Sequence, residues 1–169
     1  MGSAGSGTIG HLSGELLARE AGVKFLHVPY KGAAPVLTDL LGGSVAFSFL
    51  TLPSVVSMLK AGRLRALAVS SAKRISALPN VPTVAESGYK AFVTESWYGL
   101  VGPAKLPAAI VATINAEVGK VLRNPDVIAK LDAEGNEPLP GTPEQLAALL
   151  KTDHAKWGTV VREAGITPD

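Results

Sequence analysis

Cysteine is absent from the sequence, and charged residues are scarce. The lack of cysteine excludes disulfides, thiol chemistry and cysteine-ligated zinc. Charged residues make up 18% of the chain, below the roughly 25% of an average soluble domain. Hydrophobic residues reach 47%, which excludes a disordered chain because such chains are polar and rich in charge. The 16 basic and 14 acidic residues leave a formal charge of +2, so the composition indicates no nucleic-acid partner.

Long apolar runs are missing as well. The longest extends from Val45 to Leu59, but Ser48, Thr51 and Pro53 interrupt it, and it is too short to cross a bilayer. Residues 1–3 form neither a basic nor an apolar leader region, so no signal peptide is expected in this chain. The 169 residues correspond to one ordinary domain or two small ones, which is long enough to bury a core.

The first 96 residues alternate between helical and strand-like patterns. Apolar spacing predicts a helix over residues 9–21, with Thr8 as its N-cap and Gly22 as its stop. Further helices are predicted at residues 35–41 and 54–60, and Thr83 to Glu86 has the pattern of a capping box that opens a short helix. Apolar strands are predicted at residues 23–29, 45–49 and 64–69. This alternation is typical of an α/β fold with a parallel sheet.

From Trp97 onward the pattern is mostly helical. Helices are predicted to begin at Pro107, Asn124 and Thr142. The first and last of these carry wide apolar stripes. The first stripe consists of Ile110, Ile114, Val118, Val121 and Leu122, and the second runs over residues 146–161. A stripe of that width needs a partner surface, and no predicted sheet in this half is large enough to provide one.

Glycine and serine are concentrated in residues 3–8, which we call the glycine-serine turn. It opens the first predicted helix, and free amides at a helix N-terminus favour an anion. Ser3, Ser6 and Thr8 add hydroxyl donors. No lysine follows the last glycine, so a Walker loop is excluded, and the spacing does not fit a dinucleotide fingerprint. The turn is therefore a candidate anion site; the alternative is a flexible leader.

Other candidate residues are less specific. Tyr30 lies where the strand of residues 23–29 ends, a place where ligands often bind in open α/β sheets, although such a residue can simply pack in a turn. His11, His27 and His154 come from different predicted elements and include no pair four residues apart, so no metal site is expected. His11 is interpreted as a packing or supporting residue. No Gly-x-Ser-x-Gly motif is present, and no catalytic set is identified.

A series of segments resembles the Bug-type solute-binding receptors of tripartite tricarboxylate transporters. They appear in the family's order and cover nearly the whole chain, and together they are specific although no single one is decisive. The matching segments are residues 3–8 with His11-Leu12, residues 27–32, 35–45, 52–54, 61–69 and 78–86, and Gly141-Thr142-Pro143-Glu144.

The resemblance implies a fold of the type II periplasmic-binding-protein kind, with two α/β lobes around a cleft. Residues 1–96 would be the second lobe with its ligand-binding turn, and residues 97–169 the C-terminal return segment that completes the first lobe. It also implies a small organic carboxylate held largely by backbone amides, a membrane transporter as partner, a periplasmic location, and neither catalysis nor a cofactor. The ligand-binding residues implied are Ser3, Ala4, Gly5, Gly7, Thr8, Tyr30 and Thr51.

The sequence departs from the family pattern before Leu52-Pro53-Ser54. Family members often have Asp-Asn there, whereas this chain has Leu50 and Thr51. An acidic partner for a ligand amine is therefore missing, which favours plain carboxylates over amino acids.

Three further expectations remain beside this interpretation. The turn could serve a phosphate- or CoA-handling α/β enzyme, or the chain could be a truncated remnant that binds nothing. The C-terminal helices, without a partner sheet, could also associate with a second copy of the chain.

Overall fold

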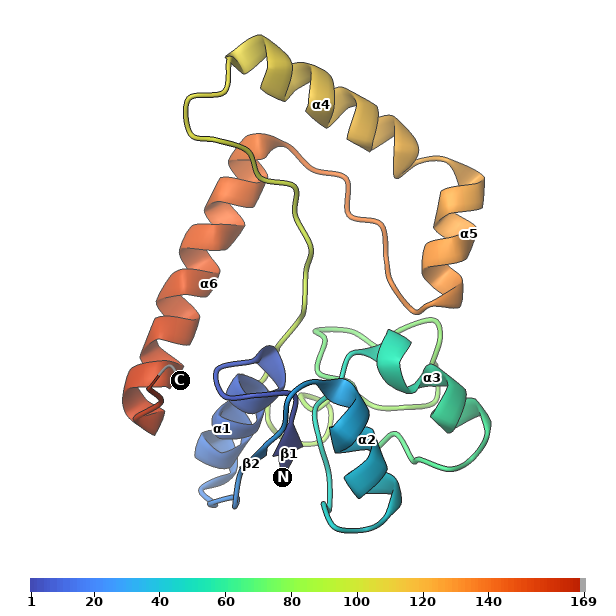
Figure 1. The fold of residues 1–169 in the computed structure, drawn as a ribbon, viewed down its shortest axis with the longest axis vertical. Helices are drawn as coiled ribbons and strands as arrows, with labels where there is room; N and C mark the ends of the chain where they lie inside the picture. The colour runs from blue at the N-terminus through green and yellow to red at the C-terminus, as the bar shows by residue number, and fades with distance from the viewer. Residues whose placement is uncertain (168–169) are drawn as a thin grey trace. The chain divides into compact units, whose positions relative to one another are not determined.

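The computed structural model describes residues 1–167, which form two compact units (Figure 1). Residues 1–96 pack together with residues 157–167, and residues 97–156 form the second unit. The last turns of helix α6 (Pro143–Ala164) therefore belong to the first unit. The assignment of residues 1–96 and 97–169 to two lobes of a larger fold stays a prediction.

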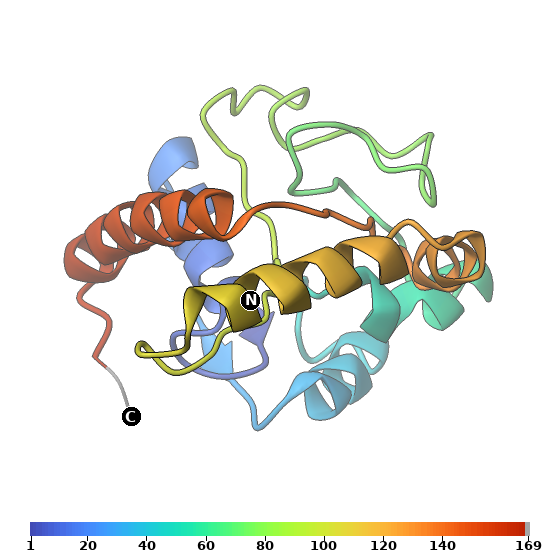
Figure 2. The same ribbon diagram turned by 90° about the horizontal axis from the view of Figure 1, so that it is seen from above.

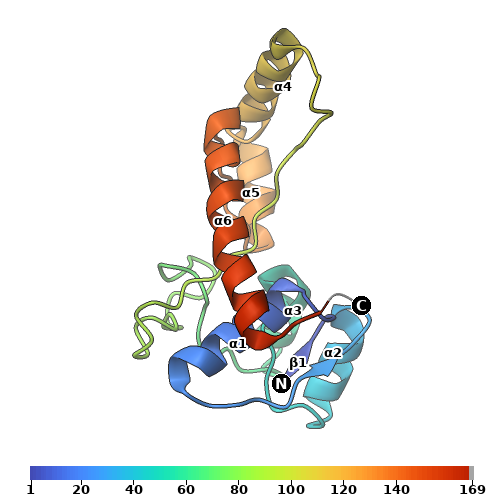
Figure 3. The ribbon, with the colours of Figure 1, turned by 90° about the vertical axis from the view of Figure 1, so that its left-hand side faces the viewer.

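A short parallel sheet organises the first unit. Strand β1 (Gly2–Ser3) pairs with strand β2 (Val28–Pro29), with Gly2 opposite Val28. On its other side, Gly2 forms a parallel bridge with Ser48, whose hydroxyl donates a 2.8 Å hydrogen bond to the Gly2 carbonyl. β1 is therefore the central segment, and helices α1 and α2 flank it (Figures 1 and 3).

Each of these parallel segments leads into a helix. β1 leads to α1 (Ile9–Ala21), β2 to α2 (Ala33–Leu41), and the segment around Ser48 to α3 (Leu52–Lys60). α1 ends as expected at Gly22, which adopts a left-handed conformation with φ 66°. The predicted alternation and parallel orientation are confirmed, and α2 and α3 each begin two residues earlier than the sequence pattern predicted.

The predicted strands are much longer than the observed ones. Of residues 23–29 only Val28–Pro29 forms a strand, and residues 45–49 contribute the single bridge at Ser48. Residues 64–69 contribute one bridge, between Val69 and Thr83, and Leu67 is 64% exposed. The extents predicted for these strands were wrong because an apolar run becomes a ladder only where a neighbouring segment offers hydrogen-bond partners.

The capping box at Thr83 forms, but it does not open a helix. The Glu86 amide donates to the Thr83 hydroxyl at 3.0 Å, and the Thr83 amide donates to the Glu86 carboxylate at 2.8 Å. The bond from the Thr83 amide, and then the neighbouring Arg74 at 2.9 Å, lower the pKa of the Glu86 carboxyl. The chain then makes a hydrogen-bonded turn over residues 84–88, so the predicted helix was wrong.

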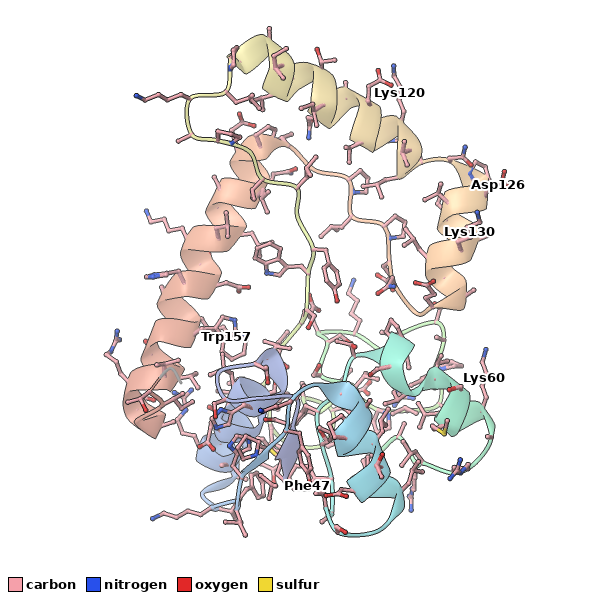
Figure 4. The ribbon with its side chains drawn as sticks, viewed as in Figure 1. Phe47, Lys60, Lys120, Asp126, Lys130 and Trp157 are labelled. Carbon is pink, nitrogen blue, oxygen red and sulfur yellow. The ribbon has the colours of Figure 1, made fainter. Side chains whose placement is uncertain are left out.

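The core of the first unit lies along one face of α1. It consists of Leu12, Leu16, Val84, Phe92 and Val160, with Trp157 packed against it (Figure 4). Ser13 and Thr94 are buried beside this core and share a 2.9 Å hydrogen bond. Phe47, also labelled in Figure 4, meets Phe25 edge to face at 5.0 Å. Aromatic contacts of this kind join the extended segments that the short sheet leaves largely unpaired.

The second unit contains α4 (Ala108–Val121), α5 (Pro125–Ala133) and the first part of α6 (Figures 1 and 2). Its predicted helix starts are confirmed. Asn124 accepts a 2.9 Å hydrogen bond from the Asp126 amide, and Thr142 and Gln145 form a reciprocal capping box at 2.8 and 3.2 Å.

The apolar stripe of α4 lies open in this chain. Ile110 is 46% exposed and Val121 is 54% exposed, and Ile114 and Val118 between them are exposed as well. Over residues 1–167, none of the helices has the length and apolar character required to cross a membrane.

A close backbone approach predicts that Gly10→Ala is destabilising. A Cβ atom on Gly10, at the start of α1, would lie 2.5 Å from the carbonyl oxygen of Phe49. We expect a loss of about 1–3 kcal/mol in the free energy of unfolding, because a main-chain carbonyl cannot move aside without shifting its segment. Thermal or urea unfolding of the variant measures this loss.

Gly158→Ala in α6 is the matched control. A Cβ there would meet only the end of the Arg162 side chain, at 3.7 Å. It should leave stability unchanged or raise it by up to about 1 kcal/mol, through the better helix propensity of alanine. Equal stability of Gly10→Ala and the parent would contradict the proposed packing constraint.

Candidate functional site

The glycine-serine turn connects β1 to α1 and is built around two glycines with positive φ. Gly5 has φ 146° and Gly7 has φ 72°, and residues other than glycine rarely adopt either backbone conformation. The Thr8 hydroxyl donates to the Gly5 carbonyl at 2.7 Å. Thr8 is thus the N-cap residue by position, as predicted, but its side chain closes the turn and does not cap the helix.

Several amides of the turn and the helix start are free to bind a ligand. Within residues 1–167, the N–H groups of Ala4, Ser6, Ile9 and Gly10 have no hydrogen-bond partner in the protein. They lie at the positive end of the α1 dipole, where an anion is stabilised. The turn can therefore bind a carboxylate or phosphate oxygen through its backbone, without a lysine or arginine.

The parallel sheet brings three helix starts to one edge. Because β1, β2 and the Ser48 segment run in the same direction, the turns before α1, α2 and α3 all follow the carboxyl ends of parallel segments. β2 lies on one side of β1, and the Ser48 segment lies on the other, so the chain crosses over β1 between β2 and Ser48. This order is the arrangement of a topological switch point. Ligands of open α/β sheets bind at such an edge.

Tyr30 reaches this edge through its backbone. Its amide donates to the Ser3 carbonyl at 3.0 Å, and the Gly32 amide donates to the Ala4 carbonyl at 2.9 Å. The Tyr30 hydroxyl, in contrast, donates to Asp39 of α2 at 2.5 Å, and this hydrogen bond raises the pKa of the phenol. The segment after β2 therefore supports the glycine-serine turn directly, while the hydroxyl is held by α2.

Thr51 is the N-cap residue of α3 and is exposed. Its carbonyl accepts a 2.7 Å hydrogen bond from the Ser54 hydroxyl. Two residues earlier, the Phe49 carbonyl lies against Gly10 in the first turn of α1. The fold thus brings the start of α3 to the same edge as the glycine-serine turn, although no hydrogen bond joins Thr51 to that turn within residues 1–167.

Two histidines meet beneath the turn, a contact that the sequence analysis did not predict. The rings of His11 and His27 stack with centroids 3.7 Å apart and an interplanar angle of 8°. His11 Nδ1 accepts a 3.1 Å hydrogen bond from the Gly7 amide, and His27 Nε2 lies 2.6 Å from the Ser3 hydroxyl. Burial, then the nearby His11 and the terminal amine, lower the pKa of His27.

The sequence held one signal for the hydrogen bond between His11 and Gly7. His11 follows Gly7 by four residues in the first turn of a helix, and such a side chain can reach back to the preceding turn. The distance between His11 and His27 along the chain gave no indication of their stacking, because the parallel pairing of β1 and β2 produces it.

Comparison with known proteins gives a family for this arrangement. Residues 1–166 match the family described as tripartite tricarboxylate transporter family receptor. A curated relative, the UPF0065 protein in the tcbD-tcbE intergenic region of a Pseudomonas species, is 40% identical over 95% of this chain and 48% of its own length. Protein BugT of Bordetella pertussis is 35% identical over 94% of this chain and 49% of its own length.

A solved structure is similar throughout. The Rhodopseudomonas palustris protein Rpa4515 with adipate has a TM-score of 0.88 and 38% identity, covering 99% of this chain and 56% of the other. The chain spans about half the length of most curated relatives it matches. The resemblance to Bug-type receptors and the periplasmic-binding-protein fold are thereby confirmed, and the chain belongs to the tripartite tricarboxylate transporter receptor family.

Proposed function

We propose that this chain is the ligand-binding part of a periplasmic receptor that holds a small organic carboxylate and delivers it to a tripartite membrane transporter. The observation that carries the proposal is the group of free amides at Ala4, Ser6, Ile9 and Gly10, at the start of α1. A carboxylate has two oxygens that accept such N–H donors, and the helix dipole adds to their attraction.

The family relationship supports a dicarboxylate as the ligand class. The similar solved protein carries adipate, a flexible dicarboxylate. In the proposed receptor, residues 1–96 are the second lobe, and the glycine-serine turn is one of two turns that hold the ligand. Tyr30 and Thr51 line the same edge as neighbours of the turn. Since this chain supplies one such turn, we expect its own affinity to be lower than that of a two-lobed relative.

The geometry favours binding over catalysis. Ser3 and His27 have the spacing of a nucleophile and its base, but Ser3 is 0% exposed and its hydroxyl also bonds to the main chain of Gly5. A buried hydroxyl held in this way cannot reach a substrate. The Ser3–His27 pair is therefore a structural element in the proposal, and the chain acts as a receptor and not as an enzyme.

The first test changes Gly7. A Cβ at this position meets no atom within 4 Å beyond the adjoining residues of the chain, although φ 72° strains any residue other than glycine. A valine side chain added beside the free amides would obstruct the close approach of a ligand to the backbone. We expect Gly7→Val to weaken adipate binding at least tenfold, measured by isothermal titration calorimetry on the 169-residue chain.

Gly43→Val is the control for backbone strain. Gly43 has φ 77° against 72° for Gly7 and equally open surroundings, but it lies at the C-terminal end of α2. Both substitutions should lower stability by about 1–2 kcal/mol through the left-handed conformation, and only Gly7→Val should weaken adipate binding. Unchanged affinity in the Gly7 variant would remove the turn from the proposed site.

The second test concerns ligand selectivity. Leu50 and Thr51 provide no carboxylate for a ligand ammonium, and burying an unpaired charge costs several kcal/mol. Glutarate and glutamate differ by that ammonium group alone, so we expect glutarate to bind at least tenfold more tightly. Leu50→Asp should narrow the difference. A preference of the parent chain for glutamate would contradict this prediction while leaving the carboxylate site in place.

The third test concerns association. We propose that the exposed α4 stripe is covered by a second copy of this chain in solution, because contiguous apolar surface of this kind promotes association. Light scattering should show a concentration-dependent increase in mass for the parent. Ile110→Lys with Val121→Lys should reduce it, whereas Thr113→Lys, at an exposed polar position of α4, should not. A parent chain that stays monomeric would exclude the proposed association.

A further inference from the structure

We propose that the stacked His11–His27 pair positions the glycine-serine turn, with each ring holding one end of it through one particular nitrogen. The inference rests on the proposed carboxylate-binding function of that turn. His11 holds the Gly7 end through Nδ1, and His27 holds the Ser3 end through Nε2.

The bond to Gly7 determines the form of His11. A backbone N–H can only donate, so Nδ1 must offer its lone pair to the Gly7 amide, 3.1 Å away. The proton of the neutral ring then lies on Nε2, which faces the Glu15 carboxylate at 3.6 Å. His11 is only 6% exposed, so water does not compete freely for this nitrogen.

The bond to Ser3 acts on the opposite end of the turn. His27 Nε2 lies 2.6 Å from the Ser3 oxygen, and the same hydroxyl donates to the Gly5 carbonyl at 3.0 Å and accepts from the Gly5 amide at 3.3 Å. Ser3 thereby ties the strand end to Gly5, and His27 fixes the rotamer of Ser3. A different rotamer would release Gly5, whose positive φ shapes the first half of the turn.

The stacking couples these two contacts. Parallel rings with centroids 3.7 Å apart restrict each other, so neither imidazole can rotate its bonding nitrogen away independently. The amides of Ala4 and Ser6 lie between the two anchored ends and have no partner within residues 1–167. The histidine pair thus keeps the Ala4 and Ser6 amides oriented for a ligand without forming hydrogen bonds to them. His11 and His27 are therefore positioning residues that need not touch the ligand.

Asparagine and glutamine distinguish the two nitrogens. The asparagine side chain places its amide near the position of histidine Nδ1, and that of glutamine reaches the position of Nε2. At position 11, His11→Asn should keep the acceptor for Gly7 and bind adipate nearly as well as the parent, whereas His11→Gln should bind about tenfold more weakly. At position 27 the order should reverse, with His27→Gln near the parent and His27→Asn about tenfold weaker.

Hydrogen exchange of the free chain provides a measurement that does not depend on a ligand. The Gly7 amide should be protected in the parent and in His11→Asn and should exchange faster in His11→Gln. The Gly5 amide should be protected in His27→Gln and exchange faster in His27→Asn. Thermal unfolding identifies any variant that fails to fold. The exchange rates of the Gly7 and Gly5 amides are then compared between the parent and the variants that fold.

The outcomes separate this inference from the proposed function. Opposite orders at positions 11 and 27 support positioning through specific nitrogens. The same order at both positions, four variants that bind and exchange like the parent, or an unprotected Gly7 amide in the parent would overturn it. If the parent does not bind adipate but the two amides still show opposite orders of protection, the positioning role stands and the carboxylate function is wrong for this probe.

Discussion

The parallel pairing of Gly2 with Val28 on one side and Ser48 on the other is the constraint on which the first unit depends. This pairing gives β1 and its two neighbours the same direction, so the chain leaves all of them at one edge. The starts of α1, α2 and α3 are collected there, and the free amides of the glycine-serine turn lie among them. A slip of one residue would exchange the two faces of these short segments and separate the turn from its supports.

The binding chemistry inferred for this edge relies on main-chain groups and not on charged side chains. Residues 3–8 contain no basic residue, and the chain as a whole carries a formal charge of only +2. Attraction for an anion therefore comes from oriented amides and the α1 dipole. Oriented amides are effective only while the backbone is held in one conformation. Hydrogen bonds to Tyr30, His11 and His27, together with the bond from Thr8 to Gly5 inside the turn, restrain it.

The two units differ in how fully they bury their apolar residues. In the first unit, α1 and the end of α6 enclose Leu12, Leu16 and Val160 in a common core. In the second unit, α4 carries an equally clear stripe and leaves it exposed. Helix formation in this region is supported by local capping at Asn124 and Thr142, which does not require a tertiary partner.

Local chemistry in the sequence determined most of the helix ends, although the capping box at Thr83 formed without a helix. Gly22, Asn124 and the Thr142–Gln145 box act within one or two turns of chain, so their outcome could be predicted residue by residue. The glycine-serine turn was predictable as the turn that opens α1 for the same reason, since glycine spacing and a following helix are local features, and its use as an anion site remains a proposal.

Only the tertiary structure decided where apolar runs become strands and which distant residues meet. Residues 64–69 have the composition of a strand but find a single partner, at Thr83, while His11 and His27 stack because β1 and β2 pair in parallel. The physical reason is that a β-ladder and a ring stack each need a second segment from elsewhere in the chain, whereas a helix and its cap satisfy their hydrogen bonds within their own residues.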